Sequence, residues 1–271
     1  MTSATLNSIY DVDFNQLYQA HLKACNHYNI PSSKWDAKAE KMAVNLVEKQ
    51  SSYRDELLQI MNVQADESVL DIGCGPGTLA LPLARVCQQV YALDYSRGML
   101  DVLQQYQQKW ALPNIQTFHL SWNDDWADVP QADVVVASRS TLVDDLDDMI
   151  AKLNAKAKKR VYLTSVTQPH FLDEGIFEAI GRDDLGFPTY IYLLNRLYQK
   201  GIKANVSFIQ SGMGSYQGGS FEELLKSVEF SLGELTAEER GKLAAFYQRK
   251  QQNNEEIKHG QNLWALISWA V

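Results

Sequence analysis

Apolar residues follow two different spacings along the chain, and the spacing changes near residue 68. Before that point they recur every three or four positions, which is the spacing of one face of a helix: Trp35, Ala39, Met42, Ala43 and Leu46. A serine followed three residues later by aspartate begins at Ser33 and again at Ser52, a pattern typical of helix starts. Residues 1–63 are therefore predicted to form a helical extension or lid.

Beyond residue 68, short apolar runs alternate with helical stripes. The predicted strands are 68–72, 89–93, 115–120, 133–137, 161–166, 205–210 and 263–271. The predicted helices are 78–87, 96–110, 142–153, 188–200, and two that begin at Ser220 and Thr236. This alternation predicts an α/β fold: a doubly wound, mainly parallel seven-stranded sheet with helices on both faces and helical insertions. Because no linker separates 1–63 from 64–271, we expect one compact unit.

The charge balance limits the classes of partner. The 271 residues carry a formal net charge of −8 and are 45% hydrophobic and 21% charged, as in ordinary globular proteins. An acidic chain is poorly suited to a phosphate backbone, so we expect a small-molecule substrate rather than nucleic acid. A basic cluster follows a predicted helix, where cations suit the helix dipole and a solvated face is expected: Lys156, Lys158, Lys159 and Arg160.

Cysteine usage and hydropathy point to a reducing compartment. The three cysteines, Cys25, Cys74 and Cys87, are odd in number and lack metal-ligand spacing. We expect no disulfide framework and no metal site. The first residues lack a basic stretch followed by an apolar one, and the apolar segment 263–271 is too short to cross a bilayer. Cytoplasm is the expected location, with no membrane association, and the oligomeric state is left open.

The most specific motif is a glycine-rich turn at the end of the first strand. It reads Asp71-Ile72-Gly73-Cys74-Gly75-Pro76-Gly77, with a helix predicted to follow. Glycines allow a tight turn and a close approach of ligand to backbone. Turns of this kind bind nucleotide-like ligands at the carboxyl ends of parallel strands.

The acids beside this turn restrict which ligands the turn can bind. The dinucleotide fingerprint is G-x-G-x-x-G, whereas this spacing is G-x-G-x-G. Asp71 would repel a pyrophosphate and favour a cationic group; S-adenosylmethionine carries an ammonium and a sulfonium and no phosphate. Asp94 ends the second strand, where a carboxylate accepts hydrogen bonds from ribose hydroxyls. NAD would use such an acid as well, so Asp94 does not separate the two cofactors.

Together with Leu93-Asp94-Tyr95-Ser96 and Met99-Leu100, this turn resembles the cofactor motifs of class I S-adenosylmethionine-dependent methyltransferases, which have a Rossmann-like domain. The resemblance implies that Asp71, Gly73, Cys74, Gly75 and Gly77 hold the methionine part and Asp94 the ribose. It places Tyr95 or Met99 against the adenine, and the loop with Trp122, Asn123 and Asp124 over its edge. Many relatives carry an acid where Ser121 stands, so adenine recognition shifts to Asn123, Asp124 or a backbone amide. Tyr95, Met99, Trp122 and Trp126 are equally compatible with packing roles.

The acceptor side is expected at the end of the fourth strand, which faces the transferred methyl in this family. There the chain reads Ser138-Arg139-Ser140-Thr141 and lacks the Asn/Asp-Pro-Pro-aromatic motif of nucleic-acid amino-methyltransferases. Arg139 offers a planar fork for an anionic substrate group, or is an exposed residue paired with an acid such as Asp144. His170 follows the fifth strand and is a candidate base, or a solvated loop histidine. Ser140 and Trp35 are further candidate substrate contacts, and Ser138 is a candidate contact of the cofactor.

The sequence thus predicts a methyltransferase that uses S-adenosylmethionine, yields S-adenosylhomocysteine and acts on a small molecule. Methyl transfer from a sulfonium requires alignment and exclusion of water more than a catalytic motif, so the sequence names no catalytic residue beyond the candidates Arg139 and His170. Two alternatives stay open: an RNA or protein methyltransferase, and a module that binds the cofactor without transferring its methyl group.

Overall fold

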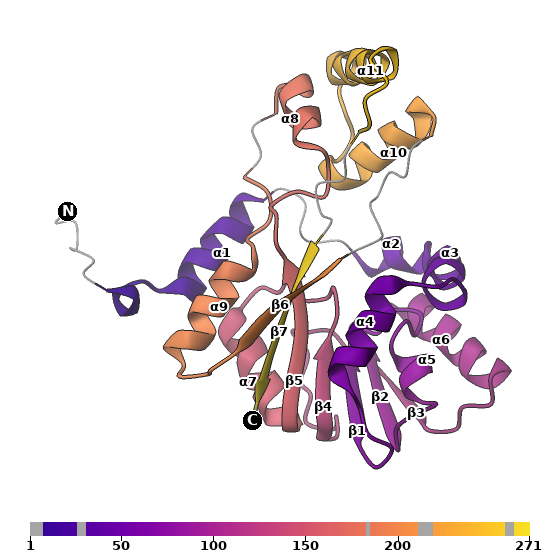
Figure 1. Ribbon diagram of the computed structural model, residues 1–271, viewed down its shortest axis with the longest axis vertical. Helices are drawn as coiled ribbons and strands as arrows, with labels where there is room; N and C mark the ends of the chain where they lie inside the picture. Colours follow the sequence, from indigo (N-terminus) through magenta and orange to yellow (C-terminus); the bar gives the residue numbers. More distant parts are fainter. Residues whose placement is uncertain (1–7, 26–30, 183–184, 211–218, 258–262) are drawn as a thin grey trace.

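The computed structural model describes residues 8–25, 31–182, 185–210, 219–257 and 263–271. Within them lies a seven-stranded sheet in the order β3-β2-β1-β4-β5-β7-β6 (Figure 1). Its strands are β1 Ser68–Ile72, β2 Gln89–Asp94, β3 Ile115–His119, β4 Ala132–Ala137, β5 Ala157–Val166, β6 Asn205–Gln210 and β7 Leu263–Ala270. Neighbouring strands pair in parallel except at β7, which runs antiparallel to β5 and β6. The predicted α/β fold with a mainly parallel seven-stranded sheet is confirmed.

Helices connect and flank these strands. The described α-helices are α1 Phe14–Ala24, α2 Ser32–Asp36, α3 Ala39–Ala43, α4 Ser52–Met61, α5 Ala80–Leu83, α6 Arg97–Lys109, α7 Leu146–Lys156, α8 Glu174–Ile180, α9 Tyr190–Gln199, α10 Phe221–Leu232 and α11 Ala237–Gln252. A 3₁₀ turn, η1 Ile9–Asp11, precedes α1, and a π-helical turn, η2 Val44–Glu48, follows α3. None of the described helices is long and apolar enough to cross a membrane.

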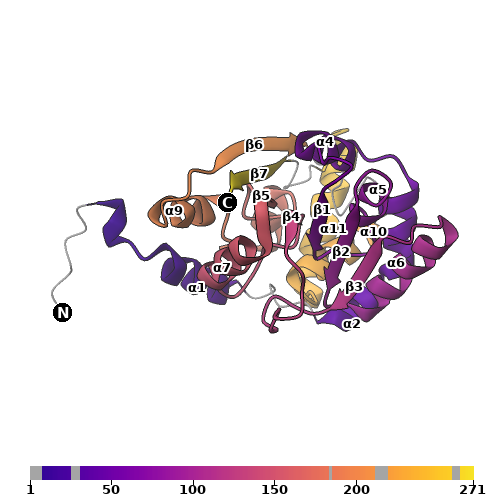
Figure 2. The same cartoon turned by 90° about the horizontal axis from the view of Figure 1, so that it is seen from below.

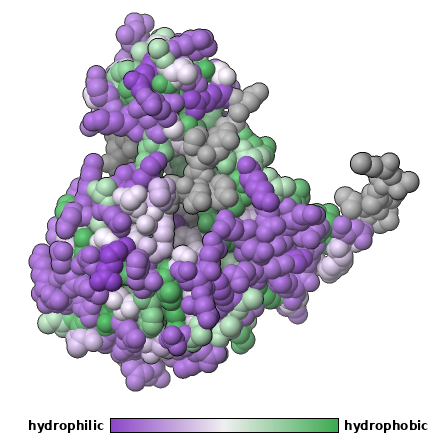
Figure 3. All heavy atoms as spheres, turned by 180° about the vertical axis from the view of Figure 1, so that it is seen from behind, coloured by the Kyte–Doolittle hydropathy of each residue, from purple (hydrophilic) through white to green (hydrophobic). Residues whose placement is uncertain are grey.

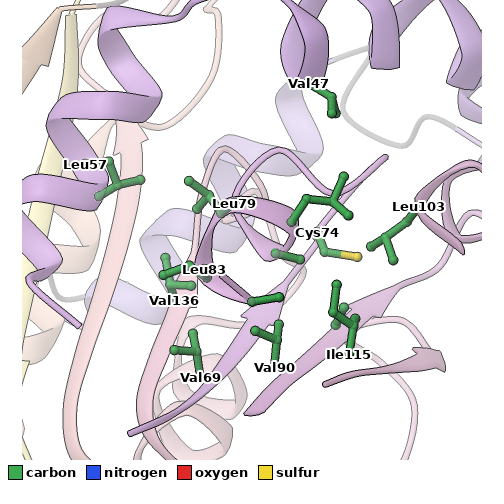
Figure 4. Packing of buried hydrophobic residues seen from close by; sticks show 14 of the residues in the cluster. Val47, Leu57, Val69, Cys74, Leu79, Leu83, Val90, Leu103, Ile115 and Val136 are labelled. Carbon is green, nitrogen blue, oxygen red and sulfur yellow. The ribbon is translucent and has the colours of Figure 1, made fainter. Parts of the chain in front are cut away.

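Alternate residues of the strands are buried on opposite faces of the sheet, each under a layer of helices; Figure 2 shows the two layers edge-on. Val69, Val90 and Val136 pack with α4, α5 and α6 on one face, and Figure 4 shows this cluster. Leu70 and Val135 pack with α1, α7 and α9 on the other face. The period-two alternation of a strand therefore divides one apolar run between two cores. The predicted helical cover on both faces is confirmed.

The N-terminal helices are shared between the two faces of the sheet (Figure 1). Helix α1 lies beside α9 and α7, and the hydroxyl of Tyr18 donates to the carbonyl of Val143 at 2.9 Å. Helix α4 lies on the opposite face and contacts β6. Helices α2 and α3 contact α6 near the carboxyl edge of the parallel strands. The described part of the N-terminal segment thus covers both flanks of the sheet.

Helix boundaries differ from the predictions at three places. The stripe from Trp35 to Leu46 is not one helix but α2, α3 and η2, and α2 begins after Pro31 without a side-chain cap. Ser51, not Ser52, caps α4. The predicted helix 78–87 is α-helical only over Ala80–Leu83, and Pro82 within it has no amide hydrogen to donate to the preceding turn. The caps at Ser96, Ser220 and Thr236 are confirmed.

Helices α8, α10 and α11 form a lobe above the carboxyl edge of the parallel strands (Figure 1). The lobe has its own apolar core, which includes Ile176, Phe177, Val228 and Leu243. On the face seen in Figure 3 its surface is mostly hydrophilic. The lobe and helix α2 therefore lie over the end of the sheet where the loops after β1, β2 and β4 meet.

An ion-pair cluster at the opposite edge corrects the interpretation of the basic residues. Arg160 forms a fork with the buried carboxylate of Glu67, at 2.6 and 2.7 Å, and Lys159 reaches both Glu67 and Asp133 at 3.2 Å. These bonds lower the pKa of Glu67 to about 2, with the bond to Arg160 contributing most. The predicted solvated face is wrong for Arg160, because β5 begins at Ala157 and brings it beside the start of β1, whereas Lys159 is exposed although it forms ion pairs.

Replacing Glu67 by glutamine should lower the free energy of unfolding by about 2 kcal/mol near neutral pH, since it removes one partner of a buried pair. The folded pKa lies below the usual 4.5, so the carboxylate stabilises the fold above about pH 4.5 and loses this effect as the pH falls toward 2. Urea unfolding at several pH values measures the difference. Lys158→Gln, at an exposed neighbour, is the control and should change stability by less than about 0.5 kcal/mol. Equal effects of the two variants would contradict the assignment.

Candidate functional site

The glycine-rich turn joins the end of β1 to α5 and is tied to β2. Gly73, Gly75 and Gly77 all have positive φ angles, of 68°, 54° and 95°. The amides of Gly73 and Cys74 donate to the carbonyl of Leu93 at 2.7 and 3.1 Å. Left-handed backbone is costly for residues with a side chain, so three such positions in five residues require glycine.

The three glycines leave different amounts of space. A Cβ atom on Gly73 would lie 2.3 Å from Cβ of Ser140, and one on Gly77 would lie 2.8 Å from the side chain of Leu81. A Cβ atom on Gly75 would meet nothing within 4 Å among the described residues. Gly73 and Gly77 therefore serve internal packing, whereas the turn is open to a ligand at Gly75.

The carboxylate of Asp71 is the most unusual group at this turn. It is 1% exposed, and its Oδ2 atom has no hydrogen-bond partner among the described residues. Burial, and secondarily the charge of Asp94, raises the pKa of Asp71 to about 7. A buried carboxylate oxygen without a donor is unfavourable in the isolated fold, and a cationic ligand would supply the missing charge and donors.

Asp94 closes the turn from the side of β2. Its carboxylate accepts hydrogen bonds from the amides of Gly75 and Ser96, both at 2.8 Å. It is buried, which raises its pKa. Each carboxylate oxygen can accept more than one hydrogen bond, so Asp94 keeps the capacity to bind hydroxyl groups. Two buried acids at the ends of neighbouring strands give this edge of the sheet a negative electrostatic potential, which disfavours a diphosphate.

Helix α2 is fastened across the turn that follows β2. Asp36 accepts from the hydroxyl of Ser96 at 2.6 Å and from the amide of Gly98 at 2.9 Å, which lowers its pKa. The side chain of Trp35 lies beside that of Tyr95. The ring of Trp35 also contacts Phe230 of the lobe edge-to-face, with ring centroids 6.4 Å apart. Trp35, expected to contact substrate, thus lies between Tyr95 and the lobe. Asp36 was missed because its pattern with Ser33 was interpreted as a cap.

Two of the residues expected at the cofactor have side chains in the core. Met99 is 3% exposed on the inner face of α6, and Cys74 is 4% exposed. Figure 4 shows the sulfur of Cys74 directed toward Leu103. Burial raises the pKa of the Cys74 thiol well above its usual value. Met99 and the side chain of Cys74 pack in the core in this structure, and a contact of either residue with the cofactor stays a prediction.

The loop after β3 is held mainly by its own contacts. The indole nitrogen of Trp122 donates to the carbonyl of Ser140 at 2.7 Å, so this loop is fastened to the end of β4. Asn123 is exposed and donates to Asp144 at 2.8 Å. Asp124 is exposed and accepts from the amide of Ser121 at 2.6 Å, a bond that lowers its pKa. Asn123 and Asp124 therefore stabilise the loop in this structure.

The end of β4 forms a cluster of hydroxyl groups that the sequence did not reveal. The hydroxyl of Tyr53, from α4, lies 2.8 Å from Oγ of Ser138 and 2.9 Å from Oγ1 of Thr164. The guanidinium of Arg139 lies 3.7 Å from the centre of the Tyr53 ring and 5.2 Å from that of Trp264. Arg139 is half-buried, not an exposed loop residue. The residues of this cluster come from α4, β4, β5 and β7, so no local sequence pattern could have indicated it.

His170 lies at the base of the lobe. Its ring packs on Phe177 of α8, with centroids 4.1 Å apart and the planes inclined by 40°. It is half-buried, so the solvated-loop interpretation does not describe it well. The loop from β5 places His170 between the sheet edge and the lobe, and a role as base stays a prediction.

Comparison with known proteins extends this description. A family model described as "Methyltransferase domain" matches residues 69–165, which contain both acids and the glycine turn. A protein of Haemophilus influenzae, described only as uncharacterized, is 70% identical over 264 residues, covering 97% of this chain and 98% of that one. A probable cobalt-precorrin-6B C(15)-methyltransferase of Methanocaldococcus jannaschii is 38% identical over only 56 residues, 21% of this chain and 31% of that one.

Among solved structures, a methyltransferase of Geobacter sulfurreducens in complex with S-adenosyl-L-homocysteine is similar in fold. The TM-score is 0.56 at 13% sequence identity, covering 89% of this chain and 98% of that one. At this level of identity the comparison concerns the fold, which is shared over nearly the whole of both chains.

Replacing Asp71 by asparagine should stabilise the ligand-free protein near neutral pH. The folded pKa of about 7 exceeds the usual 3.8, so the carboxyl group costs the fold increasingly as the pH rises from about 4 to 7. We expect a gain on the order of 1–3 kcal/mol at about pH 8 that vanishes near pH 4. Urea unfolding across this range measures it.

Asp133→Asn is the matched control, because bonds from the Ser68 amide and other donors lower the pKa of Asp133 to about 2. Its replacement should destabilise the fold at neutral pH, the opposite sign. If Asp71→Asn were also destabilising at about pH 8, the description of Asp71 as a strained, uncompensated acid would be wrong.

Proposed function

The chain belongs to the class I S-adenosylmethionine-dependent methyltransferases, and from this premise we propose that it transfers a methyl group to a small-molecule acceptor at the carboxyl edge of the sheet. The observation that carries the proposal is the buried Oδ2 atom of Asp71, which has no hydrogen-bond partner among the described residues and precedes a turn that is open at Gly75. A buried carboxylate oxygen without a donor suits a ligand with a cationic end.

The residues at the turn fit the cofactor's chemical groups. Asp71 and the backbone at Gly75 would receive the ammonium and the amino-acid end, and Asp94 would accept bonds from the ribose hydroxyls. Tyr95 is 38% exposed and flanks the same turn, which suits contact with the adenine. The indole and amide groups of Trp122 and Asn123 stay candidates for the adenine edge. Gly73 and Gly77 shape the turn, and their backbone atoms stay candidates for contact with the cofactor.

Bound S-adenosylmethionine supplies a methyl group on a sulfonium, which is already activated for displacement. The protein's own task is then to hold both partners in line and to exclude water. Helix α2, which is held by the contacts of Asp36 and Trp35, and the lobe above it cover the proposed site. A base is needed only for acceptors that must lose a proton, and His170 stays the candidate for that role.

A small acceptor suits this architecture better than a polymer. The net charge of −8 opposes the close approach of a phosphate backbone. The lobe and α2 cover the carboxyl edge from above (Figure 1), which favours a ligand that can be enclosed. Formation of S-adenosylhomocysteine with a deproteinised, nucleic-acid-free metabolite extract tests this preference. Turnover with RNA or protein alone would overturn it, and absence of any turnover would leave a cofactor-binding module instead.

Replacing Gly75 by alanine should weaken S-adenosylmethionine binding at least about tenfold, because the new methyl group occupies the open side of the turn. Gly201→Ala is the matched control: Gly201 also has a positive φ, of 76°, and nothing within 4 Å of a built Cβ. Both variants should lose about 1 kcal/mol of stability from backbone strain, but only Gly75→Ala should lose affinity. Calorimetric titration measures the affinity and urea unfolding the stability. Equal affinities would remove the turn from the binding site.

Replacing Asp94 by alanine should weaken S-adenosylmethionine binding by about 10- to 100-fold, because it removes acceptors for the ribose hydroxyls. The same calorimetric titration with NAD should show no binding to the unmodified protein. Tight binding of NAD without binding of S-adenosylmethionine would overturn the cofactor assignment.

A further inference from the structure

Helix α2 is joined to the proposed cofactor site through one buried serine. The amide of Ser96 donates to Asp94 at 2.8 Å, and its hydroxyl donates to Asp36 of α2 at 2.6 Å. Asp36 also accepts from the amide of Gly98 at 2.9 Å, so a carboxylate from another helix completes the start of α6, where negative charge is favourable. The acid expected to bind the ribose and the acid that holds α2 are therefore bonded to the same residue.

Gly98 allows α2 to approach α6 this closely. A Cβ atom on Gly98 would lie 2.9 Å from Cα of Asp36, which is backbone that no side-chain rotation can move away. Gly98 lies in the first turn of α6 without a positive φ, so alanine would suit its own helix. It is the contact with α2 that excludes a side chain at this position.

The other side of α2 contacts the lobe through Phe230. This residue is 37% exposed and lies on the side of α10 opposite to Val228 and Leu232, which belong to the core of the lobe. The rings of Phe230 and Trp35 meet edge-to-face, and the ammonium of Lys38 lies 3.1 Å from the centre of the Phe230 ring. Loss of solvent lowers the pKa of Lys38, so this contact covers the amine as well.

Few described contacts fix the lobe above the sheet. Among the described elements, α8, α10 and α11 pack extensively only against one another, and their apolar core is separate from the two cores of the sheet. A unit with its own core and few outside contacts can change position at low cost. The contact of Phe230 with α2 is therefore a substantial part of what holds the lobe in place.

A ligand at the glycine turn would favour the docked position of α2. Ribose hydroxyls on Asp94 and an adenine against Tyr95 would contact the two residues that precede Ser96. A ligand shifts a conformational equilibrium only through contacts that differ between the two states. Such a difference exists here, because Trp35 lies beside Tyr95 only while α2 is docked.

We propose that α2 couples the two binding places of the enzyme: bound cofactor keeps α2 docked on α6, and docked α2 keeps the lobe over the acceptor. Asp36, Gly98 and Phe230 are the positioning residues of this coupling. The inference rests on the proposed methyltransferase function and adds an order of binding, with the cofactor first and the acceptor second. The acceptor place is then complete only on the cofactor-bound protein, which suits a reaction that must exclude water.

Spin labels on the lobe and on α6 measure the coupling without an acceptor. Gln248→Cys on α11 and Gln108→Cys on α6 place the labels at exposed positions, and the three native cysteines are buried. In the full-length protein, saturating S-adenosylhomocysteine should narrow the distribution of label distances to one population. An unchanged distribution with S-adenosylhomocysteine bound overturns this inference and keeps the proposed function. Failure of S-adenosylhomocysteine to bind counts against the proposed function itself.

Two glycine variants test the contact between α2 and α6. Gly98→Ala should keep the label distances broad even with S-adenosylhomocysteine saturating, and should weaken its binding about tenfold or more in a calorimetric titration. Gly241→Ala is the matched control, because Gly241 is also helical and a built Cβ atom meets nothing within 4 Å there. Alanine favours a helix over glycine, so both variants should fold. Equal distances and affinities in the two variants would remove α2 from the coupling.

Phe230→Ala tests the contact between α2 and the lobe. Because coupling is reciprocal, this variant should bind S-adenosylhomocysteine more weakly by the factor by which that ligand raises the docked population of the unmodified protein, about 5- to 150-fold in typical cases. Phe208→Ala is the control, since Phe208 is 46% exposed and contacts another aromatic ring, that of Tyr190, outside the site. A purely structural role would lower the melting temperature of Phe230→Ala and leave its label distances responsive to S-adenosylhomocysteine. That result, or weaker binding with an unmoved lobe, would overturn the coupling.

Discussion

The burial of one carboxylate at the end of β1 is the constraint on which the site depends. Asp71 follows the apolar strand into the core, where burial keeps its pKa near 7 and one of its oxygens has no described partner. The glycine turn that follows leaves its backbone open at Gly75. The same geometry that weakens the empty fold thus prepares a place for a cationic group, a trade of stability for binding common at functional sites.

Acidic and basic side chains lie at different places along the carboxyl edge of the sheet. Two acids end β1 and β2, and a guanidinium follows β4 on the other side of the same glycine turn. Ser140 connects the two sides, since it contacts Gly73 and bonds Ile72. A cofactor with a cationic end would find a complementary charge at the half of this edge that carries the two acids.

The cover over the edge is held by contacts that join distant parts of the chain. Asp36 clasps the start of α6, and Trp35 connects Tyr95 with Phe230 of the lobe. The lobe has an apolar core separate from the two cores of the sheet. The lobe contacts α2 through Phe230 and Trp35, so this short helix lies between the proposed cofactor site and the lobe.

The sequence by itself determined the strands, their mainly parallel sheet, and the glycine turn with Asp71 and Asp94, because these depend on local spacing and on residues adjacent in one βαβ unit. Only the tertiary structure decided the rest. It limited the predicted helix 78–87 to Ala80–Leu83, made Arg160 the partner of Glu67 instead of a solvated cation, and directed Met99 into the core. It also placed Tyr53, Thr164 and Trp264 around Arg139. These contacts join residues from different strands and helices, and sheet order, which no local pattern records, determines which of them meet.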